Sequence, residues 1–512
     1  MPVIRDGSRV RLEVPGDRGV FHGAVQPDGN IGGFWIQPPG VTLNSAYATP
    51  ATLTLASKDV WVGEIQPLAD RITLFMKIER AEGGALTAFM RNPEFNFGLR
   101  RPMLIELDGD RVSYINKNRE GDVLRGRFDP ETRRLSMEFQ GVGTFEFSRE
   151  GVETMPGVLP ASGSEAAAPI GVPLPTQDGW ETAKPEAVGM DSKILQALAD
   201  GLRANAPDGL AAPYPHAVLV ARRGKLVFEQ YLYGHDRDRL HDTRSAGKSL
   251  TSILLGITQS RTGAFHPDTP IQTLFAMDNP DPAKSRITVE HLLTMTSGLD
   301  CDDNNEASPG NEDVMQSNRK QPDWYRYTLD LPVAREPGGK QSVYCSAGIN
   351  LLGGIIAQQS RQTLYEFFDS ELAKPLGIKR YHMNLMPDGK GYAAGGIYLR
   401  PRDALKLGQL YLDRGRWRGK RVVPAQWVAD STKRHAEFDA AHGYGYAWHL
   451  RDIQVGTQVF RSYAAEGNGG QFIIVVPEVE LVVMIAGGNY GDFKTWFALS
   501  NLVGSHVIPA VR

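Results

Sequence analysis

Cysteine is scarce in this 512-residue sequence, which contains only Cys301 and Cys345. Two cysteines permit at most one internal disulfide, so the fold cannot depend on a disulfide framework. The sequence has no window of about 18 uninterrupted apolar residues, which argues against a membrane span. It also has no extended basic run and a net charge of -3. Nothing therefore indicates a nucleic-acid partner or binding to an anionic membrane surface.

The N-terminal residues 1–7 lack the apolar core of a signal peptide. Taken at face value, this indicates a cytoplasmic protein. If Met1 was added to a trimmed chain, a periplasmic or secreted origin stays open, so the sequence leaves the localisation unknown. The oligomeric state is also left unknown by the sequence.

The length exceeds what a single hydrophobic core usually organises, so we expect at least two domains. Residues 1–150 carry short alternating apolar patterns, such as Arg71–Ile78 and Leu135–Phe139, separated by Gly, Asp and Pro turn signals. This pattern predicts an antiparallel all-β accessory domain, either a sandwich or a barrel. Residues 151–178 are rich in Pro, Ala, Gly and Ser, which predicts a linker.

The second domain is expected at residues 179–512 and has an α+β pattern. One predicted hairpin lies near its start and another near its end, with a closing helix after the second one. An antiparallel sheet assembled from both ends of the domain, flanked by helices and carrying a helical insertion, fits this order. The segments are His216–Ala221 with Lys225–Tyr231, Gln471–Val476 with Leu481–Ala486, and Thr495–Val507.

The stretch of greatest chemical interest is Ser245-Ala246-Gly247-Lys248. The surrounding residues 241–257 begin polar and turn apolar after Lys248, as expected of a helix whose body enters a core. Ser245 and Lys248 are three positions apart and so share one helix face. A serine hydroxyl becomes a nucleophile when a base takes its proton, and a desolvated lysine near a helix N-terminus can be that base.

Two other interpretations of this stretch compete. Gly247-Lys248-Ser249 matches the end of a phosphate-binding loop, but the first glycine of that motif would fall at Asp242. An acidic side chain there would repel phosphate. The other alternative is an ordinary exposed helix face, because a serine and a lysine three residues apart often occur by chance.

Other polar groups give no prediction of a metal site or cofactor. His435 and His442 lack metal-ligand spacing with a Cys or Glu partner, which favours surface histidines. The acidic run Asp302–Glu306 lacks the glycine and terminal glutamate of a calcium loop. We therefore predict a solvated loop there, and we predict neither a metal nor a cofactor.

Residues 179–512 resemble the serine hydrolase family that contains class C β-lactamases, DD-peptidases, some esterases and the aminohexanoate-dimer hydrolases. The first shared motif is Ser245-x-x-Lys248, and the second is Tyr344-Cys345-Ser346, which looks like the family's Y-x-N or Y-x-S. Segments similar to family segments also occur in order along the chain. They are His291–Leu299, Pro337-Gly338 and Pro375–Ile378.

The resemblance implies a β-lactamase-like fold and a set of catalytic roles. Ser245 would be the acylated nucleophile, with Lys248 and Tyr344 sharing the role of general base. The oxyanion would be bound by the backbone N–H of Ser245 and by an N–H of Asn468 or Gly469. Ser346 or its neighbours would orient the leaving group and the lysine.

The family's third motif, K-T-G or H-x-G, has no match at the expected point. Residues 463–471 lie where it should be, just before the C-terminal hairpin, but offer neither Lys nor His there. This is similar to the aminohexanoate-dimer hydrolase branch, and it weakens the case for penicillin or D-Ala-D-Ala. Gln471, Tyr444 and Trp448 are further pocket candidates, although aromatic residues between glycines are equally typical of packing.

Cys301 follows a turn that borders the pocket in this family, and Cys345 lies within the tyrosine motif. We therefore expect the two sulfur atoms to be close, so that a disulfide can form in an oxidising compartment. The leading functional hypothesis is a serine esterase or amidase that acts on a small-molecule or short-peptide substrate. The alternatives are a β-lactamase or DD-peptidase, and a non-catalytic sensor or binding protein that keeps the fold.

Overall fold

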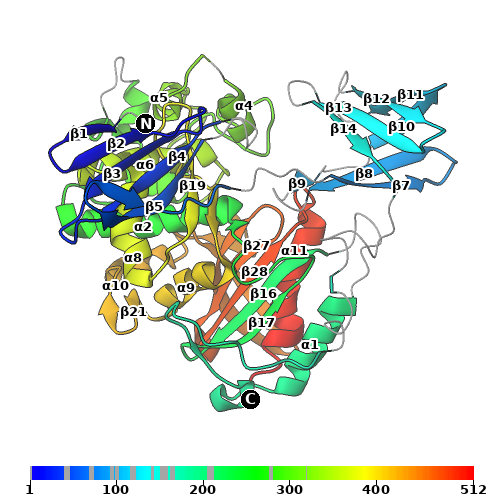
Figure 1. Cartoon of the computed structure of the whole chain (residues 1–512). Coiled ribbons are helices and arrows are strands. Elements are labelled where there is room, and N and C mark those ends of the chain that lie inside the picture. Colours follow the sequence, from blue (N-terminus) through cyan, green and yellow to red (C-terminus); the bar gives the residue numbers. More distant parts are fainter. Residues whose placement is uncertain are drawn as a thin grey trace.

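The computed structural model in Figure 1 describes most of the chain. The described residues are 3–39, 46–68, 74–92, 97–98, 103–115, 123–139, 143–149, 160–161, 168–204, 213–275, 281–318 and 320–512. Among them, none of the helices has the length and apolar character needed to cross a bilayer.

A nine-stranded sheet forms the centre of the C-terminal part, and both ends of that part contribute to it. The predicted hairpins are confirmed as β16–β17 and β27–β28, and β16 pairs antiparallel with β28, Ala217 opposite Ala486. The strands in spatial order are β15 (Glu181–Thr182), β17 (Lys225–Tyr231), β16 (Pro215–Arg222), β28 (Leu481–Gly487), β27 (Gln471–Val476), β26 (Gln458–Gly467), β25 (His449–Val455), β24 (His442–Tyr444) and β23 (Ala436–Asp439).

Helices cover both faces of this sheet, which is why its central strands are continuous apolar runs. On β16, Val218 and Val220 face a core shared with α1 (Ser192–Ala204) and α11 (Phe493–Leu502). The alternate residues Ala217 and Leu219 face a second, larger core. Figure 1 shows this layered arrangement around β16, β17, β27 and β28. The predicted α+β class is confirmed.

The larger core is built by the helical insertion. Its central helices α2 (Gly247–Thr262) and α6 (Ser346–Ser360) pack against each other, and both begin at a motif predicted to be catalytic. The remaining helices are α3 (Val289–Leu293), α4 (Glu312–Ser317), α5 (Trp324–Asp330), α7 (Leu364–Phe368), α8 (Lys374–Leu376), α9 (Pro401–Leu412) and α10 (Ala425–Ser431).

The N-terminal strands are antiparallel, as predicted, but they lie in two sheets. The first sheet does not stand alone, because β5 pairs with β19 of the C-terminal part, with Ala48 opposite Met383. The path continues through β20 to β18. Its strands are β1 (Val3–Asp6), β2 (Arg9–Glu13), β3 (Val20–Val25), β4 (Ile31–Gln37), β5 (Ala46–Ser57), β6 (Val60–Val62), β19 (Tyr381–Leu385), β20 (Ile397–Leu399) and β18 (His241–Asp242).

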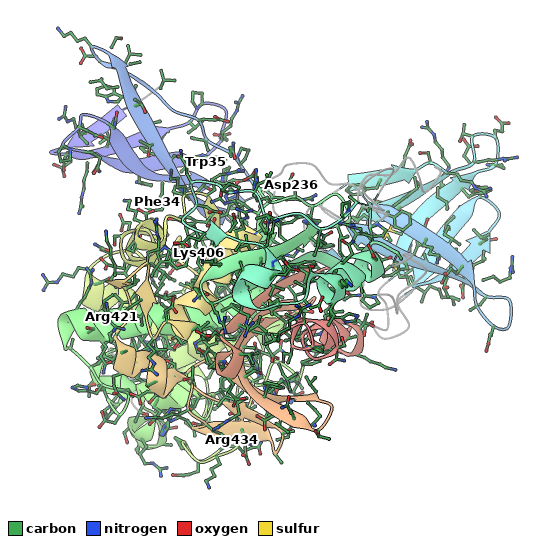
Figure 2. The ribbon with its side chains drawn as sticks, turned by 90° about the horizontal axis from the view of Figure 1, so that it is seen from below. Phe34, Trp35, Asp236, Lys406, Arg421 and Arg434 are labelled. Atoms are coloured by element: carbon green, nitrogen blue, oxygen red, sulfur yellow. A yellow bond between two sulfur atoms is a disulfide. The ribbon has the colours of Figure 1, made fainter. Side chains whose placement is uncertain are left out.

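Two neighbouring aromatic residues show how this sheet is attached. Phe34 belongs to the large core and packs edge-on against Tyr365, with ring centroids 4.9 Å apart. Trp35, on the opposite face of β4, belongs to a separate small core within the N-terminal strands. Figure 2 labels both residues at the junction. The sheet is therefore joined to the C-terminal part by backbone pairing and by buried side chains.

The second N-terminal sheet has its own small core around Met90, Tyr114 and Met137, and it lies apart from the first sheet in Figure 1. Its strands are β7 (Phe75–Arg80), β8 (Leu86–Asn92), β9 (Phe97–Gly98), β10 (Met103–Asp108), β11 (Arg111–Ile115), β12 (Val123–Asp129), β13 (Arg134–Phe139) and β14 (Gly143–Phe147). The domain boundaries at 150 and 178 stay predictions, because residues 150–159 and 162–167 lie outside the described residues.

Candidate active site

Ser245 lies in a tight turn that enters helix α2. Strand β18 ends at Asp242, a 3₁₀ turn spans Arg244–Ala246, and α2 begins at Gly247. Arg244 has a φ of +48°, a left-handed conformation that a non-glycine residue adopts at a cost of about 1 kcal/mol or more. The Asp242 carboxylate stabilises it, because it accepts the Arg244 backbone N–H at 2.8 Å and pairs with the guanidinium at 3.0 Å.

Lys248 is the immediate partner of this serine. Its Nζ donates to Ser245 Oγ at 2.8 Å and to the backbone oxygen of Ala394 at 2.8 Å. The side chain is only 2% exposed. Burial lowers the pKa of Lys248, while the charges of Glu312 and Asp303 act in the opposite direction. A lowered pKa increases the fraction of neutral amine, which is the form that can accept a proton.

Tyr344 lies on the other side of the serine. Its ring centroid is 5.1 Å from Lys248 Nζ, and its hydroxyl is hydrogen-bonded to Ser245. Burial raises the pKa of Tyr344 well above its usual value, and the charges of Asp303 and Glu312 raise it further. The hydrogen bond to Ser245 acts in the opposite direction. The tyrosinate is therefore disfavoured in this state, so the expected sharing of the general-base role is not supported by the electrostatics.

Two partly buried carboxyl groups lie close to these residues, and the sequence did not reveal either. Asp303 comes from the run expected to be a solvated loop, yet its Oδ2 accepts the backbone N–H of Ser346 at 2.8 Å. Its Oδ1 accepts the N–H of Glu312 at 2.9 Å. Burial raises the pKa of Asp303 to about 6, the charge of Glu312 adds to the rise, and Lys248 opposes it. The prediction of a solvated loop is wrong for this residue.

Glu312 is surrounded by hydrogen-bond donors. Tyr392 Oη donates to Oε1, as does Gln316 Nε2 at 3.2 Å, and Ser346 Oγ donates to Oε2 at 3.3 Å. Ser346 was expected to contact the leaving group, but it is fully buried and its hydroxyl is directed to Glu312. We therefore assign Ser346 to the support of α6 and Glu312.

The glycine segment at the end of β26 packs directly against the serine turn. A Cβ at Gly467 would lie 2.4 Å from the backbone oxygen of Thr243 and 3.1 Å from the backbone nitrogen of Ala246, so only glycine permits this approach. Asn468 Oδ1 accepts the N–H of Gly491 at 2.8 Å. Gly469 has a φ of +94° and its carbonyl accepts the N–H of Asn489 at 3.0 Å.

Gln471 holds this segment in place. Its Nε2 donates to the carbonyl of Gly487 at 2.7 Å and to that of Asn468 at 3.3 Å. The side chain is buried. Gln471 therefore supports the backbone near the serine turn, which differs from the expected contact with substrate.

The two aromatic pocket candidates are fully buried. Trp448 packs against Tyr411, with ring centroids 4.3 Å apart, and edge-on against Tyr463. Of the two alternatives for this residue, the structure favours packing. Tyr444 lies 4.9 Å from the His449 ring and 5.1 Å from the Phe438 ring, and it too has no exposed surface through which to contact a substrate in this state.

A disulfide joins Cys301 to Cys345, with a Cα–Cα distance of 5.3 Å. It links the Tyr344 segment to the segment that carries Asp303. A backbone hydrogen bond reinforces the link, because the Asp303 N–H donates to the Tyr344 carbonyl at 2.9 Å. Tyr344 and Asp303 are thus held in one unit.

Within the part of the chain that the structure describes, two groups of side chains are close enough together to hold a metal ion. Both contain histidines that the sequence did not connect. One is His216, His235 and His241, and the other is His442, His449 and Glu466. His442 is buried, so the prediction of a surface histidine is wrong there. His435, by contrast, is partly exposed and pairs with Glu290 at 3.1 Å.

Comparison with known proteins identifies the family. A model of the beta-lactamase family matches residues 208–491, which is more than half of the chain. The chain belongs to the beta-lactamase family. The resemblance predicted this family, and the match confirms it.

The relatives of this beta-lactamase-family chain are diverse. It is 26% identical over 223 residues to 6-aminohexanoate-dimer hydrolase of Paenarthrobacter ureafaciens, a match that covers 41% of this chain and only 55% of that relative. Among solved structures, a Bacillus anthracis protein assigned as a 6-aminohexanoate-dimer hydrolase has a TM-score of 0.50 at 16% identity, covering 58% of this chain and 81% of the other. A Bacteroides dorei DSM 17855 protein assigned as a beta-lactamase has a TM-score of 0.50 at 18% identity, covering 62% and 99%. These structural matches show the fold alone.

Proposed function

We propose that this chain is a serine hydrolase that cleaves an ester or amide bond through an acyl-enzyme on Ser245, as a carboxylesterase or amidase. The observation that carries the proposal is the contact of 2.8 Å between Lys248 Nζ and Ser245 Oγ. A hydroxyl within hydrogen-bond reach of a desolvated amine is the arrangement of an activated nucleophile. The beta-lactamase family match over residues 208–491 supports the same chemistry.

Lys248 acts as the general base in the acylation step. The neutral amine takes the proton of Ser245 Oγ while the oxygen attacks the substrate's carbonyl carbon. Burial favours this assignment, because it lowers the pKa of Lys248. The charges of Glu312 and Asp303 then stabilise the ammonium that forms, so the amine can both accept the proton and later release it.

Tyr344 acts as the proton donor to the leaving group. Its raised pKa keeps the phenol protonated before reaction, and its hydrogen bond to Ser245 places it beside the reacting oxygen. When the tetrahedral intermediate collapses, Tyr344 gives its proton to the leaving alcohol or amine and regains one from the Lys248 ammonium. Water then attacks the acyl-enzyme, with Lys248 again as base, and the acid product is released from Ser245.

The oxyanion requires two donors aimed at the position where the negative charge develops. We assign the backbone N–H of Ser245 as one donor and the N–H of Asn468 or Gly469 as the other. The close packing of Gly467 on the serine turn supports this assignment, because it brings the two segments together. Removal of such a donor typically raises the barrier by about 3 kcal/mol.

An activity-based probe tests the proposal directly. A fluorophosphonate should form one adduct per chain, and mass spectrometry should locate it on Ser245. Ser245→Ala is the matched control and should give neither an adduct nor turnover of p-nitrophenyl esters. A folded wild-type chain without an adduct would contradict the proposal and favour a non-catalytic binding protein.

A second assay separates the enzyme classes. We expect turnover of p-nitrophenyl esters or linear amides to exceed turnover of nitrocefin, because residues 463–471 offer neither Lys nor His at the expected point. Faster hydrolysis of nitrocefin than of any ester would instead assign the site to a β-lactamase. Labelling of Ser245 is expected in either case, so this assay tests substrate class alone.

A further inference from the structure

Three histidines from separate segments meet behind the serine turn. His216 lies on β16, His235 follows β17, and His241 is in β18, four residues before Ser245. Their nearest ring nitrogens all lie within 4.8 Å of one another. His216 Nδ1 and His241 Nε2 are only 2.9 Å apart. The spacing along the chain does not resemble a metal motif, so only the fold brings these rings together.

The hydrogen bonds fix the tautomer of His241. Its Nδ1 lies 3.2 Å from the backbone oxygen of Asp242, and a carbonyl oxygen can only accept a hydrogen bond. The proton therefore resides on Nδ1, and Nε2 presents a lone pair toward His216. Metal-bound histidines are typically oriented in this way, with the distal N–H donated to a backbone carbonyl.

His235 supplies a second, independent observation. Its Nε2 is buried and has no hydrogen-bond partner among the described residues. A buried polar nitrogen without a partner costs free energy unless something binds it.

The other cluster is much less suitable for a cation. In it, Arg451 Nε pairs with Glu466 at 2.9 Å and Arg451 Nη2 donates to His442 Nδ1 at 3.0 Å. A guanidinium already supplies the positive charge there. A divalent ion between His442, His449 and Glu466 would be held against that charge.

We propose that His216, His235 and His241 form a binding site for a first-row transition metal ion, with Zn²⁺ as the best match. Three imidazoles with one remaining coordination position are a common set for zinc, whose bonds to nitrogen are about 2.0–2.1 Å long. The site is separate from the proposed catalytic residues and does not depend on the proposed function.

Binding requires one local adjustment. The His216 and His235 rings are stacked, 11° from parallel with centroids 4.0 Å apart, so their in-plane lone pairs do not converge on one point. Coordination by all three therefore requires the His235 ring to rotate out of the stack. His235 lies in the connection between β17 and β18, where such a rotation disturbs no strand pairing.

The three histidines lie next to both segments near Ser245, namely the serine turn and the glycine segment at the end of β26. His241 lies on the strand that leads into the Ser245 turn. On the other side, a Cβ at Gly488 would lie 2.6 Å from the His216 ring, and the next residue, Asn489, donates to the carbonyl of Gly469. A metal ion here would fix the serine turn and the glycine segment relative to each other.

Metal titration of the whole chain tests the site without reference to activity. After dialysis against a chelator, the wild-type chain should bind one Zn²⁺ in competition with a chromophoric chelator. Co²⁺ at one equivalent should give the visible bands of a nitrogen-ligated ion. His235→Ala should lower the Zn²⁺ affinity by at least about 100-fold, whereas Ser245→Ala and His442→Ala should bind as the wild type does.

The outcomes are distinct. The proposal would be overturned if the wild-type chain did not bind Zn²⁺. It would also be overturned if His442→Ala lost Zn²⁺ binding and His235→Ala kept it. If His235→Ala does not fold, the unaltered chain still decides the question. Zn²⁺ should then protect His216, His235 and His241 from carbethoxylation, as mapped by mass spectrometry, and equal labelling with and without Zn²⁺ would count against the site.

Discussion

Loss of the Cys301–Cys345 disulfide should destabilise the beta-lactamase-family part of the chain strongly. The two cysteines are 44 positions apart. Closing a loop of this length removes about 13 cal/mol/K of entropy from the unfolded chain, which corresponds to about 4 kcal/mol at 25 °C. Folded proteins are typically stable by only about 5–15 kcal/mol. The bond therefore accounts for a large share of the stability of this part of the chain.

The same structure predicts a much smaller effect on catalysis. Asp303 remains tied to this segment by its backbone bond to Tyr344 and by the bond from the Ser346 N–H to its carboxylate. These contacts keep Tyr344 in place while the chain is folded. Ester turnover by the folded, reduced protein should therefore fall by less than about tenfold, or about 1.4 kcal/mol.

Urea unfolding of three samples measures both effects. The samples are the oxidised chain, the chain in reductant, and the double variant Cys301→Ser/Cys345→Ser, which retains an acceptor for the Gly348 N–H at the start of α6. With a slope of about 2–3 kcal/mol/M, the unfolding midpoint of the beta-lactamase-family part should fall by about 1–2 M in the latter two samples. A shift equivalent to less than about 1 kcal/mol, with both thiols shown to be free, would refute the reasoning.

Three further results are expected. Glu312→Gln removes a charge that raises the pKa of Lys248. The acid limb of the pH profile of kcat/KM should therefore move to lower pH. An acid limb at the same pH as in the wild type would show that Glu312 does not affect the pKa of Lys248. Gly467→Ala places a methyl group against the serine turn. We expect kcat to fall by about 10²–10³, because an oxyanion donor is displaced. Unchanged activity would show that β26 does not contribute to the oxyanion site. Burial lowers the pKa of both His241 and His442 to about 3 in the folded state. For His442, the neighbouring His449 and Arg451 add to this effect. In the unfolded chain, histidine titrates near 6.5. Their contribution to stability is therefore complete above about pH 6.5 and is lost on acidification at roughly 1.4 kcal/mol per pH unit for each histidine; urea midpoints that stay constant from pH 7 to 5 would contradict this.

The candidate site was predictable where its residues are close in sequence or form a motif. Ser245 and Lys248 are three positions apart at a helix start, so local geometry alone brings the amine to the hydroxyl. Tyr344 could be found because it begins a recognisable motif ahead of α6. The two hairpins of the central sheet were likewise readable from apolar runs that flank short turns.

The supporting residues were hidden because their partners are distant in sequence. The acidic run around Asp303 has the composition of an exposed loop, and only the folded chain shows that its carboxylate caps α6 and approaches Lys248. The same holds for β5 and β19, which pair although more than 300 residues separate them. Alternation predicts a strand but not its neighbour, so the pairing of β5 with β19 could not be predicted.

The charged and titratable side chains on β24, β25 and β26 form one internally paired group. Arg451 carries a positive charge, but its guanidinium is paired with Glu466 and bonded to His442. A guanidinium cannot accept a hydrogen bond, so His442 Nδ1 must be the acceptor and its Nε2 carries the proton toward His449, 2.8 Å away. Burial lowers the pKa of both imidazoles far below neutrality, and the charge of Arg451 adds to this effect. The charges of this group therefore cancel internally.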